Sequence, residues 1–197
     1  KTPLRDDPNA HRNAALHYID EGEGEPVLFI HGNPTWSFYF RNLIKGLRGQ
    51  NRCLALDHLG CGLSEKDPDF HYRLDDRIQV VEQMIDQLLL DRVHLVMHDW
   101  GGAVGMGYAV RFPERIRTVT LTNTAAFRSE RISWRINMCR QPVIGRAINY
   151  TFNGFLEAAL RIGACRKLTK TEKAAYRLPY RNRREREAID RFVKDIP

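Results

Sequence analysis

A short segment of the sequence combines the residue types of a nucleophile and its supporting turn. Asp99 follows the apolar run 93–97 and stands directly before Trp100-Gly101-Gly102. This pattern matches the nucleophile elbow, G-x-S-x-G, in which a sharp turn between a strand and a helix exposes one side chain, but with aspartate in place of serine. The start of the following helix directs free N–H groups and a positive dipole end toward that side chain. We therefore expect Asp99 to be ionised and presented to a substrate.

An aspartate at this position predicts displacement chemistry at carbon. A carboxylate that attacks carbon leaves an ester between substrate and enzyme, which water or an internal elimination must then resolve. The residue type excludes a serine-esterase mechanism. The alternative is that Asp99 only caps the helix that follows, which is a frequent role of aspartate.

A second segment, His31-Gly32-Asn33-Pro34, follows the apolar run 27–30 and supports the catalytic interpretation. In such an arrangement the oxyanion hole takes one backbone N–H from this kind of loop and another from the residue after the nucleophile. The Asn33 amide and the Trp100 indole are N–H donors suited to a leaving anion or a developing oxyanion. Their structural alternatives are a turn residue and a core aromatic. Asp57 and Ser64 flank a glycine-rich loop, and we interpret them as turn-forming residues without a catalytic role.

The elements that must position these residues alternate along the first two thirds of the chain. The pattern predicts strands at 27–30, 53–56, 93–97 and 119–121, and helices at 36–47, 74–90 and 103–110. This alternation indicates the α/β class, with a mainly parallel, doubly wound sheet. After Phe127 the strand signals stop, and short helices are expected, separated by Pro142, Gly145, Gly154, Gly163 and Pro179. We therefore divide the chain into residues 1–127 and 128–197. The glycines that follow Asp99 do not have the G-x-G-x-x-G spacing of a dinucleotide site.

Composition and charge exclude several other classes of protein. The chain has 197 residues, 43% of them hydrophobic and 28% charged, as in ordinary globular proteins. Its net charge of +7 combines a net −3 in residues 1–127 with a net +10 in residues 128–197. The basic residues alternate with apolar ones at helical spacing and no nucleic-acid-binding motif accompanies them, so we expect solvated helix faces and no nucleic-acid binding. No apolar run approaches the roughly 18 residues of a membrane-spanning helix.

Two further patterns bear on the compartment. The N-terminal residues are polar and have no apolar core with a cleavage site, so no signal peptide is expected. The four cysteines form no C-x-x-C pair and have no closely spaced histidine, which favours free, buried thiols in a reducing compartment. Together these patterns predict a cytoplasmic protein.

The two motifs together resemble a known family. His31-Gly32-Asn33-Pro34-Thr35-Trp36 and His98-Asp99-Trp100-Gly101-Gly102 are similar to the haloalkane dehalogenase branch of the α/β-hydrolase superfamily, and the resemblance covers nearly the whole chain. Within that branch, segments 33–39, 105–108 and 123–127 look most like the β-lactone decarboxylases of bacterial long-chain olefin biosynthesis. The resemblance implies an α/β-hydrolase fold in which residues 1–127 are the N-terminal part of the core and residues 128–197 are part of a helical cap.

The resemblance also implies a function. Asp99 would be the nucleophile, and Asn33 and Trp100 would stabilise the leaving or developing anion. The substrate would be a cis-3,4-dialkyl-β-lactone that loses carbon dioxide to give a cis-alkene, without a metal or an organic cofactor. Long alkyl chains would suit the apolar side of the cap, and its basic outer face would suit acidic partner enzymes of olefin biosynthesis or a membrane surface. A haloalkane dehalogenase is the first alternative.

An epoxide hydrolase and a non-catalytic protein are also compatible with these motifs. An epoxide hydrolase uses an elbow aspartate as well, but needs cap tyrosines, and Tyr150, Tyr176 and Tyr180 cannot be placed from sequence. A non-catalytic binding protein on the same fold is the hypothesis from a different functional class.

The general base of the superfamily has no counterpart in this sequence. The superfamily order is nucleophile, acid, histidine, whereas all seven histidines precede Asp99. His31 and His98 are poor substitutes because both lie in the turns that shape the site. We therefore expect this chain to be a fragment truncated at both ends, with its acid and histidine encoded downstream, and to be inactive by itself.

Overall fold

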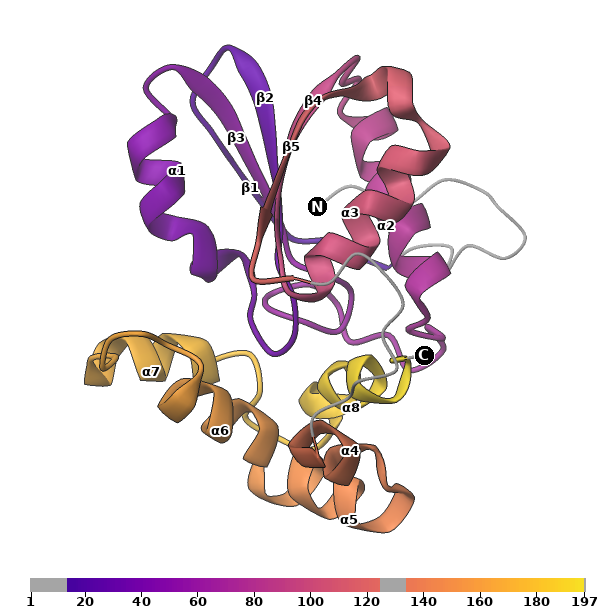
Figure 1. Ribbon diagram of the computed structural model, residues 1–197, viewed down its shortest axis with the longest axis vertical. Helices are drawn as coiled ribbons and strands as arrows, with labels where there is room; N and C mark the ends of the chain where they lie inside the picture. The colour runs from indigo at the N-terminus through magenta and orange to yellow at the C-terminus, as the bar shows by residue number, and fades with distance from the viewer. Residues whose placement is uncertain (1–13, 125–133, 197) are drawn as a thin grey trace.

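A computed structural model describes residues 14–124 and 134–196 and contains a mostly parallel sheet. Five strands lie in the order β1-β3-β2-β4-β5 (Figure 1). Their bounds are Tyr18–Glu21 (β1), Glu25–Ile30 (β2), Asn51–Leu56 (β3), Val93–His98 (β4) and Ile116–Thr122 (β5). β1 pairs antiparallel with β3, and the other three pairings are parallel. The carboxyl ends of β2, β3 and β4 therefore meet at one edge of the sheet.

Helices cover both faces of the sheet (Figure 1). The short helix η1 (Ser37–Phe40) and α1 (Arg41–Leu47) lie on one face, while α2 (Leu74–Gln87) and α3 (Trp100–Arg111) lie on the other. A further short helix, η2 (Pro113–Arg115), precedes β5. The central strands β2 and β3 end in four consecutive buried residues because both of their faces are covered.

Residues 134–196 form a group of helices beyond the carboxyl ends of the parallel strands (Figure 1). We call this group the helical segment. Its elements are α4 (Trp134–Arg140), α5 (Pro142–Arg146), η3 (Ala147–Thr151), α6 (Gly154–Ile162), α7 (Lys170–Arg177), η4 (Arg184–Arg186) and α8 (Glu187–Lys194). The predicted boundary at Phe127 lies outside the described residues. Within the described ranges, no helix has the length and apolarity needed to cross a bilayer.

Most of the predicted elements are confirmed, with local corrections. The predicted helix 36–47 consists of η1 followed by α1, and the helix after the elbow begins at Trp100, three residues earlier than predicted. β1 was not predicted. Gly145 lies inside α5, where a Cβ would overlap the Cys139 carbonyl, so it permits close packing and does not separate two helices. Three cysteines are buried as expected, but Cys165 is exposed.

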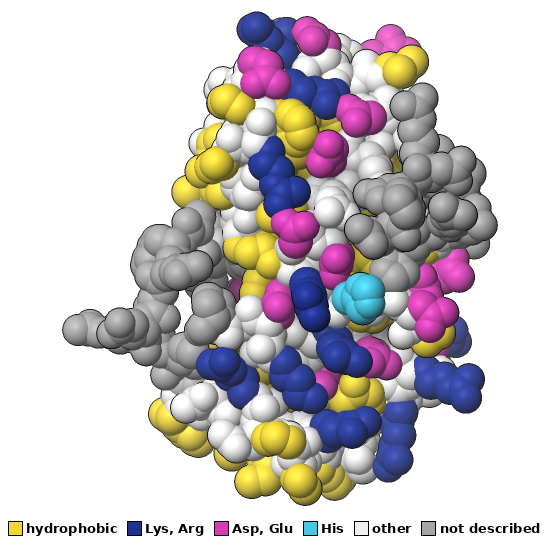
Figure 2. All heavy atoms as spheres, turned by 90° about the vertical axis from the view of Figure 1, so that its right-hand side faces the viewer, with side chains coloured by type: hydrophobic (Ala, Val, Ile, Leu, Met, Phe, Trp, Pro, Cys, Tyr) yellow, Lys and Arg dark blue, Asp and Glu magenta, His cyan; other side chains and the backbone are white. Residues whose placement is uncertain are grey.

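The surface reflects the charge difference between the two parts of the chain. In Figure 2, acidic and basic side chains alternate on the upper part of the molecule. Lys and Arg side chains gather lower down, toward the helical segment, and hydrophobic side chains lie at the lower tip. The basic part of the sequence is therefore a separate surface of the folded molecule.

Candidate active site

Asp99 occupies the sharp turn between β4 and α3. Its backbone has φ 52° and ψ −127°, a left-handed conformation that is uncommon for a residue with a side chain. The side chain makes no capping hydrogen bond to α3. Instead, its Oδ1 accepts a hydrogen bond of 2.7 Å from the backbone N–H of Asn33, 66 positions earlier. This geometry argues against a role limited to helix capping and joins the two sequence motifs at one point.

Two glycines allow the loop after β2 and the elbow to approach each other. A Cβ atom on Gly32 would overlap the Asp99 carboxylate and the Trp100 backbone nitrogen. A Cβ atom on Gly101 would overlap the carbonyl of Ile30 at the end of β2. Glycine is therefore required at these positions because backbone and side chain meet there without room for a methyl group.

Opposing influences set the protonation of Asp99. Burial of the carboxylate raises the pKa of Asp99 above its ordinary value, because removal from water disfavours the charged form. The nearby backbone N–H groups of Trp100 and Asn33 and the nearby His98 lower the pKa of Asp99 and so act in the opposite direction. The two N–H groups predicted to line an oxyanion hole thus lie beside the carboxylate itself, and the Asn33 N–H binds its Oδ1.

The two predicted anion donors are positioned by the same helix of the helical segment. The Asn33 side chain is buried, and its Nδ2 donates a 3.1 Å hydrogen bond to the carbonyl of Ile189 in α8. The Trp100 ring lies 5.4 Å, between centroids, from the ring of Phe192, also in α8. Sequence reasoning missed both α8 residues. The apolar spacing of Ile189, Phe192 and Val193 could have indicated a buried face, but not which residues it contacts.

The Phe192 ring also packs against the side chain of Arg77 in α2. The Arg77 guanidinium lies 3.4 Å from the centroid of the Phe192 ring, within the range of a cation–π interaction. Arg77 is fully buried, and none of its three side-chain nitrogens has a hydrogen-bond partner among the described residues. Burial lowers the pKa of Arg77 to about 10. The Phe192 ring beside Trp100 therefore packs against the buried Arg77 guanidinium, which has no directly bonded carboxylate among the described residues.

This arrangement predicts an unusual response to Arg77→Met in the full-length protein. We expect the free energy of unfolding to change by less than about 1 kcal/mol, because apolar replacements of buried charges are often neutral or stabilising. Arg77→Ala should lose about 2–4 kcal/mol, since it leaves a cavity beneath Phe192. Urea unfolding of both variants measures the difference. A large loss of unfolding free energy in Arg77→Met would mean that Arg77 has a bonded counter-charge, contrary to the structure.

His31 and His98, the two histidines in the turns at the site, make local contacts. His31 Nδ1 lies 2.9 Å from the Gly32 carbonyl, and its Nε2 accepts the backbone N–H of His58 at 2.9 Å. Both ring nitrogens are thus occupied, and burial lowers the pKa of His31 to about 4. His98 stacks on Tyr39 with ring centroids 4.2 Å apart. That neither residue replaces the missing base stays a prediction.

Asp57 and Ser64 hold neighbouring loops together. The buried Asp57 carboxylate accepts hydrogen bonds from the backbone N–H groups of Ser37 and Leu63 and lies 2.8 Å from His17 Nδ1. The Ser64 hydroxyl donates to the Asp57 carbonyl at 2.6 Å. Burial opposes ionisation, but His17, His31 and the two backbone N–H groups keep the pKa of Asp57 below its ordinary value. These contacts agree with the interpretation that both residues are structural.

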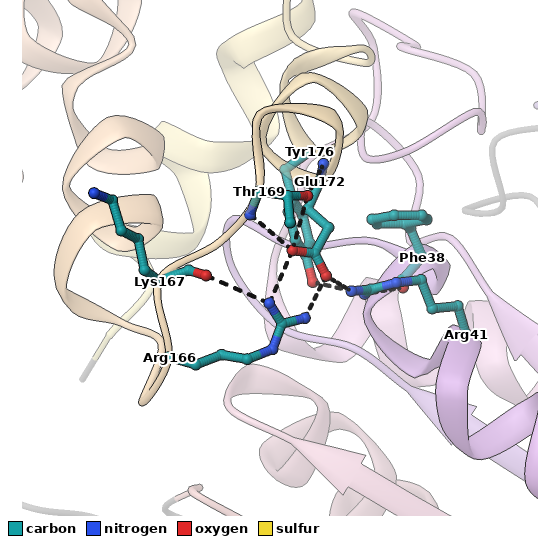
Figure 3. A network of polar contacts seen from close by, with 7 residues as sticks. All are labelled: Phe38, Arg41, Arg166, Lys167, Thr169, Glu172 and Tyr176. Carbon is teal, nitrogen blue, oxygen red and sulfur yellow. Dashed lines mark hydrogen bonds and ion pairs between the residues drawn. The ribbon is translucent and has the colours of Figure 1, made fainter.

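A polar network fastens α7 to the start of α1 beside the site (Figure 3). Arg41 Nη2 donates to Glu172 Oε1 at 2.6 Å, and Arg166 binds both carboxylate oxygens of Glu172. The Thr169 hydroxyl accepts the Glu172 backbone N–H at 3.1 Å, which caps α7. The Phe38 ring packs edge-on against Tyr176, with ring centroids 5.2 Å apart. The helical segment therefore contacts η1 and α1 through both polar and apolar side chains.

The chain is similar to known proteins over nearly its whole length. The family described as alpha/beta hydrolase fold matches residues 25–186. Cis-3-alkyl-4-alkyloxetan-2-one decarboxylase of Shewanella oneidensis is 42% identical over 189 residues, covering 92% of this chain and 59% of that protein. Haloalkane dehalogenase 2 of Mycobacterium tuberculosis is 36% identical over 183 residues, covering 92% of this chain and 64% of that protein. The chain thus spans about three fifths of the length of these curated relatives.

Solved structures support the same relationship. The crystal structure of haloalkane dehalogenase DbeA from Bradyrhizobium elkani matches with a TM-score of 0.86 and 30% identity. The match covers 93% of this chain and 66% of that one.

Proposed function

This chain belongs to the alpha/beta hydrolase fold family, and on that premise we propose that the full-length protein decarboxylates cis-3,4-dialkyl-β-lactones to cis-alkenes. Asp99 is the proposed nucleophile, and Asn33 and Trp100 are the proposed anion donors. Residues 1–127 are the proposed N-terminal part of the core, and residues 128–197 are the proposed part of a helical cap. The helical segment 134–196 lies within this cap. The observation that carries the proposal is the Asp99 carboxylate held at the elbow by the Asn33 N–H at 2.7 Å.

The reaction proceeds in two steps in this proposal. One Asp99 oxygen attacks the ring carbon that bears the ring oxygen, forming a carbon–oxygen ester bond as the ring carbon–oxygen bond breaks. The freed carboxylate is the developing anion that the side-chain amide of Asn33 and the indole N–H of Trp100 stabilise. The bond between that carboxylate and the chain then breaks, its electron pair forms the double bond, and Asp99 leaves as a carboxylate with release of carbon dioxide.

The stereochemistry follows from this sequence of steps. Attack from the side opposite the ring oxygen places the new ester oxygen anti to the carboxylate. Elimination from that arrangement leaves the two alkyl groups on the same side of the double bond. Because elimination itself frees Asp99, this reaction requires no water activated by a histidine.

A haloalkane dehalogenase is the second candidate. In that reaction Asp99 displaces a halide, which Asn33 and Trp100 bind, and water must then hydrolyse the ester. The name and 42% identity of the Shewanella relative favour the decarboxylase over the dehalogenase, whose named relative is 36% identical.

The epoxide hydrolase hypothesis receives less support from the tyrosines. Tyr180 Oη donates to the Thr35 carbonyl at 3.3 Å, and Tyr176 Oη accepts from Arg41 at 3.5 Å. Tyr150 lines a hollow on the outer surface of the helical segment. None of the three hydroxyls has a recorded hydrogen bond to Asp99 within residues 14–124 and 134–196.

The test is an assay of the full-length protein with a long-chain cis-β-lactone, with alkene detected by gas chromatography. Alkene and carbon dioxide in equal amounts would support the proposal. Halide release from bromoalkanes without alkene from the lactone would favour the dehalogenase. A folded protein that binds the lactone without turning it over would favour the non-catalytic binding protein.

The raised pKa of Asp99 predicts the acid limb of the pH profile. The nucleophile must be ionised, so kcat/KM should fall as the pH drops through the pKa of Asp99, and this fall should lie above the ordinary aspartate value of 3.8. The measurement is kcat/KM for the lactone against pH, with circular dichroism at each pH to show that the protein stays folded. An acid limb below pH 3.8 would contradict the role assigned to Asp99.

A further inference from the structure

The outer face of the helical segment carries large apolar side chains that the fold does not cover. Val143 is 80% exposed and Phe152 73% exposed, and Ile144 between them in sequence is also exposed. We call Val143, Ile144 and Phe152 the apolar ridge. Exposed large apolar residues close together commonly mark an interaction site. Hydrophobic side chains are visible at the lower tip of the molecule in Figure 2, where α4–α6 lie in Figure 1.

A basic hollow adjoins the apolar ridge. It has a volume of about 310 Å³ and is lined by Arg146, Ala147, Tyr150, Thr151 and Arg183. Ala147 lies one helical turn after Val143, and Phe152 directly follows Thr151, so residues of the ridge adjoin the hollow. Within residues 14–124 and 134–196, neither arginine forms an ion pair with a carboxylate. The hollow therefore presents two guanidinium groups that are not directly paired with a carboxylate.

Neighbouring contacts hold the hollow in shape. Arg183 Nη2 donates to the Thr151 hydroxyl at 3.3 Å, and the Arg146 guanidinium lies 5.6 Å from the centroid of the Tyr150 ring. Arg186 of η4 donates to the Tyr150 carbonyl at 2.7 Å, which fixes the loop that carries Arg183 against η3. The two guanidinium groups and the hydroxyl thus converge before any ligand is present.

We propose that this surface binds the anionic face of a phospholipid bilayer. A headgroup phosphate would lie in the hollow between Arg146 and Arg183, because guanidinium groups bind phosphate oxygens with paired N–H donors. The apolar ridge would enter the boundary between headgroups and acyl chains. Apolar side chains beside cationic ones on one helix face are the pattern of interfacial membrane binding. The inference goes beyond the proposed reaction and does not depend on it.

The test is co-sedimentation of the full-length protein with vesicles at low salt. One set of vesicles is phosphatidylcholine alone, and the other also contains phosphatidylglycerol. We expect binding to the anionic vesicles, weak binding to the neutral ones, and release from the anionic vesicles at high salt, because salt screens exposed charges. Inorganic phosphate at matched ionic strength should not release the protein, which distinguishes the bilayer from a free anion.

Paired substitutions test whether vesicle binding uses the basic hollow and the apolar ridge. Arg146→Gln with Arg183→Gln should weaken binding to anionic vesicles by about 25-fold, since each basic residue near the leaflet contributes about fivefold. Val143→Ser with Phe152→Ser should weaken binding to anionic vesicles at low salt without changing its salt dependence. The matched control is Lys45→Gln with Arg92→Gln, which removes the same charge from exposed positions in the sheet half of the molecule and should change binding by less than about twofold.

Several results would overturn the inference. These are equal binding to neutral and anionic vesicles, or no binding to either. A third is an equal loss of vesicle affinity in the hollow variant (Arg146→Gln with Arg183→Gln) and in the control variant (Lys45→Gln with Arg92→Gln). Binding to acidic proteins with no binding to vesicles would also reject it, in favour of a protein partner. Asp99→Ala should bind vesicles normally, so loss of alkene formation and loss of vesicle binding are independent results.

Discussion

Replacing Asp99 by alanine should lower alkene formation from the β-lactone by at least about 10⁴-fold, because removal of a covalent nucleophile eliminates the step that opens the ring. The side chain lies at the elbow with its Oδ1 bound by Asn33, and it makes no capping bond that α3 would lose. We therefore expect the loss to be chemical. Gas chromatography of the alkene under saturating lactone measures it.

A matched carboxylate separates this effect from a change in charge. Asp91 is exposed and lies just before β4, whereas Asp99 lies just after it, so Asp91→Ala removes the same charge from the opposite end of the strand. This variant should keep full activity. The circular dichroism spectrum and unfolding midpoint of Asp99→Ala should stay close to those of the unmodified protein. Alkene formation that survives in Asp99→Ala would reject covalent catalysis by this residue.

Gly32→Ala is expected to have the second-largest effect, although it adds only a methyl group. That methyl would overlap the Asp99 carboxylate and the Trp100 backbone nitrogen, so the loop or the elbow must move. A displacement of about 1 Å at reacting groups costs about 100-fold in rate, and overpacking destabilises by about 1–3 kcal/mol. Measured kcat/KM and urea unfolding should both show the loss.

Gly46→Ala is the control for Gly32→Ala. Gly46 lies in α1, and a Cβ atom there would have no neighbour within 4 Å. Alanine at a helical position is favoured over glycine by about 0.8–1.0 kcal/mol. This variant should therefore be slightly more stable and equally active. If Gly32→Ala behaved in the same way, the close approach of the two motifs would be of no consequence.

The parallel strands and the elbow were predictable because their signals are local. Continuous apolar runs such as 53–56 indicate strands buried on both faces, and the glycines after Asp99 indicate a helix packed closely on a strand. β1 escaped prediction because Tyr18–Glu21 has only two apolar residues and one neighbouring strand. Its place is set by antiparallel pairing with β3, a contact between distant parts of the chain.

The surroundings of the site were less predictable than its central residues. Asp99, Asn33 and Trp100 were predicted as site residues from residue type and spacing, and the structure brings them together. The acceptor for the Asn33 amide is the backbone carbonyl of Ile189, 156 positions away, and a backbone carbonyl has no sequence signature. The place of Arg77 was unpredictable for a different reason. A charged residue in α2 is expected to face water, whereas the Arg77 side chain is buried beneath Phe192. Only tertiary packing determines such contacts.

The hydrogen bond from Asn33 to Ile189 also links two motions. The Asn33 amide, a proposed anion donor, is oriented by α8, and the indole of Trp100 packs on Phe192 of the same helix. If α8 swings away from the strand ends, both donors lose their orienting contacts at the same moment. In the proposed reaction, release of the anion would therefore be coupled to displacement of α8.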